Sequence, residues 1–275
     1  MLLRILFLLI YYRCAELRYI NQEVDQATFQ CVIRPFHQLL PDNEILYTSA
    51  NHEVVIPYAS DVFGANIQSN VYDAELDQGV IVFDRAVTSI GDNAFYECTN
   101  LTSIIIPNSV ASIGELAFFY CTSLASIDIP NSVTHISQKA FYSCMGLTSI
   151  TIPSSVTSIE AYTFSCSGLT SITIPSTVTS IGWAAFSYCT SLTSITIPEN
   201  VTFIDGFAFD NCSSLTSINI PDNVTSIEKY TFNDCSSLTS IAIPSTVTRI
   251  GEYAFGGCSG LTSISLPNGL LSLES

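Results

Sequence analysis

The spacing of the cysteines is the first feature that could indicate a chemical site, because eight of the ten recur at a near-constant interval. They are Cys98, Cys121, Cys144, Cys166, Cys189, Cys212, Cys235 and Cys258. A zinc site needs four converging ligands in paired spacing, so a column of single thiols predicts no metal. We expect these thiols to be small buried groups that pack like apolar side chains. Disulfides between neighbouring repeats remain an alternative, because stacked strands bring Cα atoms within disulfide range.

Residues that could act in catalysis are scattered. The three histidines, His37, His52 and His135, have no base or nucleophile recurring beside them. The chain also lacks a G-x-S-x-G elbow, a phosphate-binding loop, an H-E-x-x-H zinc motif and a dinucleotide fingerprint. We therefore predict no catalytic, cofactor-binding or metal-binding residues, and a protein that is not an enzyme.

A repeat of 23 residues positions these side chains. Prolines recur at 107, 130, 153, 175, 198, 221, 244 and 267, and phenylalanines at 95, 118, 141, 164, 186, 209, 232 and 255. The single step of 22 in each series is attributed to a residue missing between Phe164 and Cys166. A period of about 20 to 29 residues with regularly spaced Leu and Ile is typical of leucine-rich repeats. The prediction is a β-rich repeat solenoid of about eight coils.

Each coil is expected to contain three pieces. In the copy at 192–212, Ile195 and Ile197 alternate with polar residues, which predicts a strand with one buried face. Pro198 ends this strand, since proline cannot continue the hydrogen-bonded ladder. A second short extended stretch follows, and apolar residues at offsets 0, 4, 5 and 8 from Ile204 predict a short helical turn.

The outward positions of the first strand carry mostly Ser and Thr, and they present a flat, nearly uncharged face. We predict a protein-binding surface there that acts through many weak contacts, because it lacks the aromatic and Arg anchors of a tight interface. Its candidate residues are Ser126, Asp128, Thr148, Ser149, Thr151, Thr170, Ser171, Thr173, Thr193, Ser194, Thr196, Ser217 and Asn219. The alternative is that Ser and Thr simply suit an exposed β surface.

Residues 1–80 differ in texture from residues 81–275, where the repeats lie. The first segment shows no period, and we expect a cap with degenerate coils near 53–57 and 79–84 that shields the open end of the stack. The stretch 1–12 is too short to cross a bilayer but is similar to the apolar core of a signal peptide, although Arg13 spoils the cleavage site. A buried first strand is the alternative. Cys14 and Cys31 also lie in this segment and could pair with each other.

The formal net charge of −16 argues against nucleic acid or an anionic membrane surface as a direct partner. Charged residues make up only 12% of the chain against 48% hydrophobic residues, a composition that suits a stacked β structure.

The repeat L-T-S-I-T-I-P-x-x-V-T-S-I-G-x-x-A-F-x-x-C closely resembles the BspA-like, or Treponema pallidum-type, leucine-rich repeats, over about residues 80–275. The resemblance implies a cell-surface or secreted protein that mediates adhesion or protein–protein interaction with host matrix proteins or cell surfaces. An intracellular or coat scaffold that assembles end to end is the first alternative. An ice-binding face is the second, although Thr ranks on both outward positions would be required for it.

Overall fold

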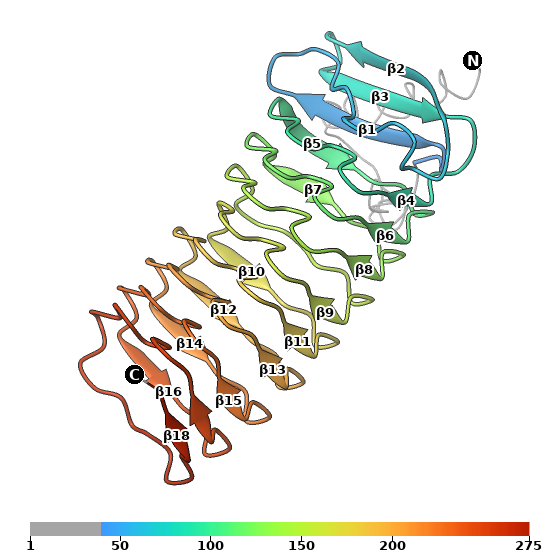
Figure 1. Cartoon of the computed structure of the whole chain (residues 1–275). Helices are drawn as coiled ribbons and strands as arrows, with labels where there is room; N and C mark the ends of the chain where they lie inside the picture. Colours follow the sequence, from blue (N-terminus) through green and yellow to red (C-terminus); the bar gives the residue numbers. More distant parts are fainter. Residues whose placement is uncertain (1–39, 275) are drawn as a thin grey trace, which may run out of the picture. The chain divides into compact units, whose positions relative to one another are not determined.

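The computed structural model describes residues 40–274, in which the repeats form a stack of coils (Figure 1). In six coils a strand places Ile inward and mostly Ser or Thr outward, as in the buried–exposed alternation of Ser194–Thr196. These strands pair in parallel and in register, Ser171 with Ser194 and Ser194 with Ser217. They are β5 (Leu101–Ile105), β7 (Ser126–Asp128), β10 (Ser171–Thr173), β12 (Ser194–Thr196), β14 (Ser217–Asn219) and β16 (Ser240–Ala242).

The same pairing recurs on the opposite side of each coil, where the predicted second extended stretch forms very short strands. There the inward residue is Ile in every coil but the last, where Leu273 stands at the equivalent position and is exposed. Between the two strands a turn begins at the proline, with the Val201 N–H donating to Pro198 O at 3.0 Å. The strands are β4 (Ser89–Ile90), β6 (Ser112–Ile113), β8 (His135–Ile136), β9 (Ser158–Ile159), β11 (Ser180–Ile181), β13 (Phe203–Ile204), β15 (Ser226–Ile227), β17 (Arg249–Ile250) and β18 (Ser272–Leu273).

Three antiparallel strands precede the coils, namely β1 (Glu44–Ser49), β2 (Ile67–Asp73) and β3 (Gln78–Phe83). They extend the first sheet in the order β2-β3-β1-β5-β7. The expected boundary at residue 80 lies within β3. Most of 79–84, expected to be a degenerate coil, belongs to this strand, which pairs antiparallel with β1. Residues near 56 do lie against the first coil, because the Cys98 thiol donates to Ile56 O at 3.4 Å.

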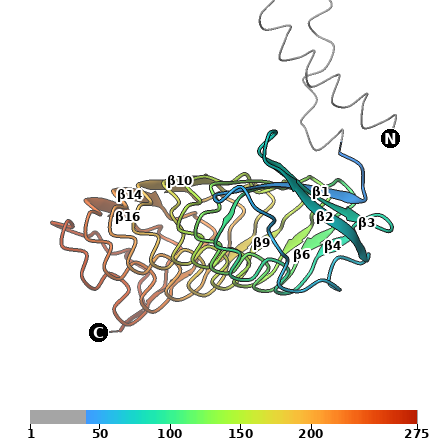
Figure 2. The same ribbon diagram turned by 90° about the horizontal axis from the view of Figure 1, so that it is seen from above.

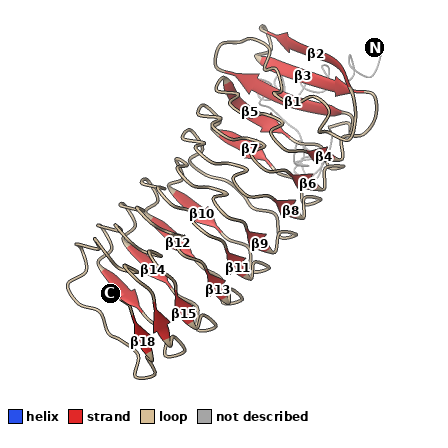
Figure 3. Ribbon diagram, viewed as in Figure 1, coloured by secondary structure: helices blue, strands red, loops and turns tan. Residues whose placement is uncertain are grey.

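The predicted helical turn is wrong, because the part of the chain that the structure describes contains no helix (Figure 3). Two residues per coil, four apart around the phenylalanine, instead have φ between 50° and 64°, as in Asn93 and Glu97. The left-handed backbone lets every second N–H point along the stack: Phe95 donates to Ala117 of the next coil at 2.7 Å, while Tyr96 donates back to Asn93 at 3.2 Å. A helix would satisfy these donors within one coil, whereas this turn joins neighbouring coils.

A continuous core fills the stack. The repeat phenylalanines form a column whose rings lie parallel at centroid distances of 5.3 to 5.7 Å, from Phe95 to Phe255. Leu, Ile and Val of each coil surround this column and are fully buried in most coils. No helix among residues 40–274 is long and apolar enough to cross a membrane. The predicted signal-like stretch 1–12, Cys14, Cys31 and His37 lie outside the described residues.

Candidate protein-binding faces

The structure brings the thirteen predicted residues together on one face, formed by β7, β10, β12, β14 and the segment 148–151. We call this the strand face; Figure 2 shows β10, β14 and β16 along the same side of the stack. Twelve of the thirteen side chains are exposed, and Asp128 is half-buried. Segment 148–151 forms no strand of its own, and it pairs with the next coil through the isolated bridge between Thr151 and Thr173.

The threonines directly before β10 and β12 hydrogen-bond to the preceding coil through their hydroxyl groups. The Thr193 hydroxyl donates to Thr170 O at 3.1 Å, and the Thr193 amide donates to the same oxygen at 3.0 Å. Thr170 makes the same contact to Thr148 O at 3.2 Å. A donor that is bound to the preceding coil is not offered to a ligand. The serine rank, with Ser171 and Ser194, and the outward threonines of β10 and β12 are therefore the more available part of the face.

Asn219 is also engaged with the preceding coil. Its side-chain amide donates to Ile197 O at 2.8 Å and accepts from the Ile197 N–H at 3.0 Å. The amide thus satisfies the backbone where the strand ends before Pro198, a structural role that the sequence pattern did not suggest.

Sequence reasoning missed a second face. We call the seven residues that follow each short second strand the turn edge: 91–97, 114–120, 137–143, 160–166, 182–188, 205–211, 228–234 and 251–257. A chain of exposed or partly exposed aromatic side chains, the aromatic ladder, begins at Tyr58 beside the first of these segments and continues along the turn edge through Tyr96, Phe119, Tyr142, Tyr162, Trp183, Phe207, Tyr230 and Tyr253. Ring centroids of neighbours are 4.5 to 6.3 Å apart, and the Trp183 Nε1–H donates to the Tyr162 hydroxyl at 3.1 Å.

The aromatic ladder changes its place in the repeat at the fourth coil. Tyr96, Phe119 and Tyr142 follow the buried phenylalanine directly, whereas Tyr162 and Tyr230 precede it by two residues. The contact between Tyr142 and Tyr162, at 6.3 Å, joins the two halves. Trp183 departs from both positions, since it precedes Phe186 by three residues. These changes of position break the aromatic period, and this explains why a single repeat template does not reveal it.

Beyond the crossover, the position vacated by the aromatic rings holds polar groups. Asp210 is almost fully buried there, where it accepts from the Asn233 side chain at 2.9 Å and from the Ser187 hydroxyl at 3.4 Å. Burial raises the pKa of this carboxyl above its usual value, although the Asn233 hydrogen bond opposes the shift.

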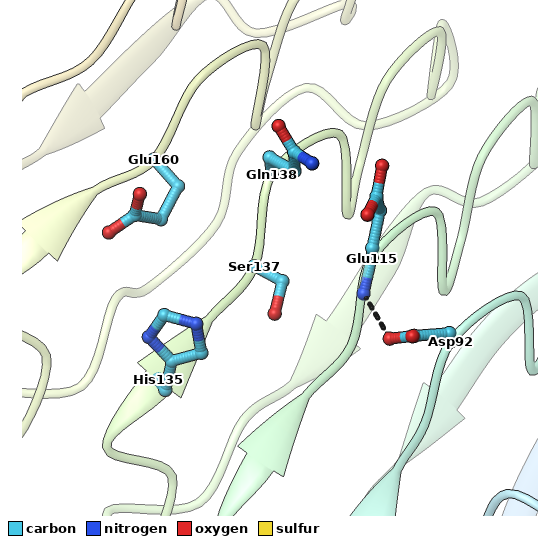
Figure 4. Close-up of a pocket in the computed structure, with 6 residues that line it drawn as sticks. All are labelled: Asp92, Glu115, His135, Ser137, Gln138 and Glu160. Carbon is cyan, nitrogen blue, oxygen red and sulfur yellow. Dashed lines mark hydrogen bonds between the residues drawn. The ribbon is translucent and has the colours of Figure 1, made fainter.

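Acidic side chains gather on the turn edge. It holds nine of the thirteen Asp and Glu residues that follow residue 86, with only Lys139 and Lys229 as cations. The turn edge borders the short second strands of the coils, such as β8. A pocket of about 310 Å³ at this border is lined by Asp92, Glu115, His135, Ser137, Gln138 and Glu160 (Figure 4). The Glu115 N–H donates to Asp92 Oδ1 at 2.8 Å. Among the described residues, no group of three or more His, Cys, Asp or Glu side chains is arranged to hold a metal ion.

The remaining histidines lie apart. His52 contacts Asp77 at 2.8 Å on the exposed surface before the coils, and His135 is exposed on β8.

The cysteine column is confirmed in part. The eight repeat cysteines are free thiols, and six of them are buried. Each buried thiol from Cys121 onward donates to the phenylalanine carbonyl of the preceding coil, as Cys144 does to Phe118 O at 3.1 Å. Burial raises the pKa of Cys189 to about 12.

Cys166 does not belong to this column, which corrects the predicted placement of the missing residue. In the short coil, Ser167 takes the buried column position, with its hydroxyl 3.3 Å from the Cys189 sulfur. Cys166 instead occupies the left-handed position of the turn edge, with φ of 57°, and is half-buried. The residue is therefore missing after Ser167, not between Phe164 and Cys166.

The fold and these two faces define a leucine-rich repeat solenoid, a class that generally serves as a non-enzymatic scaffold for binding proteins. The family model described as BspA type leucine rich repeat region matches residues 88–213 and 179–275, with six copies. The chain belongs to this family, as its repeat signature predicted.

Seven solved chains are similar to this one. One is the leucine-rich repeat protein of T. pallidum, with 30% identity, coverage of 65% of this chain and 73% of that chain, and a TM-score of 0.47. Another is a leucine-rich cell surface protein of Faecalibacterium prausnitzii, with 32% identity, coverage of 68% and 69%, and a TM-score of 0.39. A third, from Bacteroides ovatus, has 27% identity, coverage of 66% and 71%, and a TM-score of 0.38. No curated protein matches.

Proposed function

We propose that this protein is a non-enzymatic adhesion or interaction module, displayed at the cell surface or secreted, that binds proteins of a host matrix or cell surface. Membership in the BspA-type repeat family supports the coarser part of this proposal, the binding of proteins. The apolar stretch at 1–12 supports export.

The strand face carries the proposal. It is nearly uncharged, it recurs in successive coils, and its serine rank and outward threonines face solvent. Such a face offers the same weak contact at every coil, so affinity is expected to grow with the number of coils engaged. A single substituted coil should weaken binding less than two neighbouring ones.

Binding of the full chain to immobilised matrix proteins tests the proposal. Ser171→Gln with Ser194→Gln places two larger neutral groups on adjacent strands, and we expect about tenfold weaker binding, or about 1.4 kcal/mol. The control makes the same change at Ser176 and Ser191, which are exposed but lie off the strands. Equal binding by both double variants, or no binding by the unaltered chain to any matrix or cell-surface protein, would contradict this role for the strand face.

A further inference from the structure

We propose that the turn edge is a second docking surface, distinct from the strand face, and that its occupant is an extended protein segment bearing Lys and Arg side chains. The aromatic ladder supplies anchors along the stack, and the acidic side chains beside it supply charge complementarity. This goes beyond the strand-face proposal, because it names a different face and a partner of defined chemistry.

The first support is the aromatic ladder itself. Its rings are partly exposed in every coil, and Tyr and Trp are enriched among the residues that dominate interface energies. Beside the ladder, Tyr120 and Tyr188 are 42% and 51% exposed. The strand face has no comparable anchors, so the two faces differ in kind.

The distribution of charge gives the second support. The turn edge carries most of the acids of the coils, whereas the strand face carries Asp128. Acids and rings also lie close to one another: desolvation raises the pKa of the Tyr96 and Tyr230 phenols, and the negative charges of Glu97 and Glu252 add to these shifts. A negative field next to aromatic rings attracts cations and repels anionic partners.

The chain's own lysines provide the third support, because both already bind to the aromatic ladder. The Lys229 ammonium lies 5.2 Å from the centre of the Trp183 ring, and the Lys139 ammonium lies 5.8 Å from that of Tyr162. These distances fall within the range of cation–π contacts. They show that an ammonium group fits against these rings, and we infer that a partner's Lys or Arg side chains use the same mode.

The pocket lined by Asp92, Glu115 and Glu160 extends this surface toward the short second strands, such as β8. Figure 4 shows Asp92 and Glu115 on neighbouring coils and Glu160 two coils beyond Glu115, with His135 and Gln138 on the coil between. Three carboxylates along one border suit a row of cationic side chains rather than a single ion, because the groups follow the stack.

Trp183 makes the proposal directly measurable, since it is the one tryptophan of the chain and stands in the aromatic ladder. The probe is an acetylated peptide of about twelve alternating Arg and Ser residues, which in extended form reaches about as far as eight coils. Titration into the full chain should change Trp183 emission in a saturable manner, with an apparent affinity that falls as salt rises. A peptide with Glu in place of Arg should leave the emission unchanged.

Two variants separate the contributions of charge and of rings. Glu97→Gln with Asp234→Asn and Glu252→Gln should weaken peptide binding about tenfold. Tyr96→Ser with Tyr230→Asn should weaken it at least about fivefold, as expected for anchor residues. Both variants are first checked for an unaltered circular dichroism spectrum, and binding is also followed by the anisotropy of a fluorescein-labelled peptide.

The strand-face variant Ser171→Gln with Ser194→Gln is the control, and it should bind the Arg peptide like the unaltered chain. The proposal is overturned if the Arg peptide causes no change, if the Glu peptide binds equally, or if the ring variant binds as tightly as the unaltered chain. Because these outcomes concern the Arg peptide alone, failure here leaves the strand-face result intact, and the reverse also holds.

Discussion

Cys166 shows how one residue's position in a coil decides its chemistry. The column cysteines are buried against backbone carbonyls, and burial raises the pKa of Cys98 to about 11 and that of Cys189 to about 12. Thiolate is the reactive form, so these side chains should be inert near neutral pH. Cys166 lies on the turn edge and is only half-buried, so it lacks the buried environment of the column cysteines.

We therefore expect brief treatment with a maleimide near pH 7.5 to modify Cys166 well before Cys121, Cys144 or Cys212. Mass spectrometry of the digested protein gives the order of labelling residue by residue. Cys258 is partly exposed but has a pKa raised to about 11 by burial, so it should react more slowly than Cys166. Comparable early labelling of Cys166 and the buried column would contradict the assigned register.

Asp210 provides a second prediction at this scale. Its pKa is higher in the folded chain than the ordinary 3.8, so the native state binds more protons than the unfolded one between these two values. The free energy of unfolding contributed by this group is therefore largest at low pH and is lost as the pH rises through the folded pKa.

Asp210→Asn should remove this pH dependence, because a neutral amide can keep the contacts with Ser187 and Asn233. Thermal melts should show a higher Tm for the variant at pH 7 and a shrinking difference toward pH 3. Ser187→Ala serves as a reference for loss of a contact without a change of charge. A variant that is less stable than the unaltered chain at pH 7 would show that the ionised carboxylate is favourable.

At the scale of the element, the turn edge replaces the expected helix with a hydrogen-bonded connection between coils. Left-handed backbone at two positions per coil costs energy for residues other than glycine. The compensation is the donor that each turn sends to the next coil, as Asn211 N–H does to Asn233 O at 2.8 Å. In the last coil, Gly257 holds the left-handed position that Asn211 holds in its own coil.

Asn211→Val should lower the free energy of unfolding by about 1–2 kcal/mol, because a β-branched residue fits the left-handed region poorly. Asn211→Gly should be close to neutral. Urea unfolding of the two variants gives the comparison, with Ser191→Val as a control at an exposed site off the turn edge. Similar stability of the Val and Gly variants would contradict the turn conformation assigned here.

The sequence predicted the coil period, both strands, the proline turn and the buried column, because each leaves a side-chain type at a fixed position. It did not predict the conformation around Phe209, since apolar offsets of 0, 4, 5 and 8 fit a helix and this turn equally well. The difference lies in where the backbone donors go, which side-chain pattern does not record. The strand face residues were placed correctly on one surface, whereas the roles of Thr193 and Asn219 in stacking depend on contacts between coils.

For the whole molecule, stability is distributed along the stack, because each coil contacts mainly its neighbours. Interior phenylalanines are enclosed on both sides, as Phe186 is by Phe164 and Phe209 at 5.5 Å. Phe255 is only partly buried and stacks on Phe232 at 5.6 Å. The cost of removing a ring should therefore depend on its place in the stack.

Phe186→Ala should lower the free energy of unfolding by about 3–5 kcal/mol, as expected for loss of a fully buried ring. Phe255→Ala should cost clearly less, because its site is partly open. Urea unfolding monitored by circular dichroism gives both values. Equal losses of free energy at the two positions would contradict the expectation that the cost depends on the place of the ring in the stack.

The most direct test of the central claim, that this solenoid is displayed to proteins outside the cell, is labelling with a membrane-impermeant amine reagent. The chain has two lysines, Lys139 and Lys229, and both lie on the turn edge, with Lys229 exposed. We predict that intact producing cells yield protein modified at Lys229, as found by mass spectrometry of the recovered chain. Labelling that occurs only after the cells are lysed would contradict the claim.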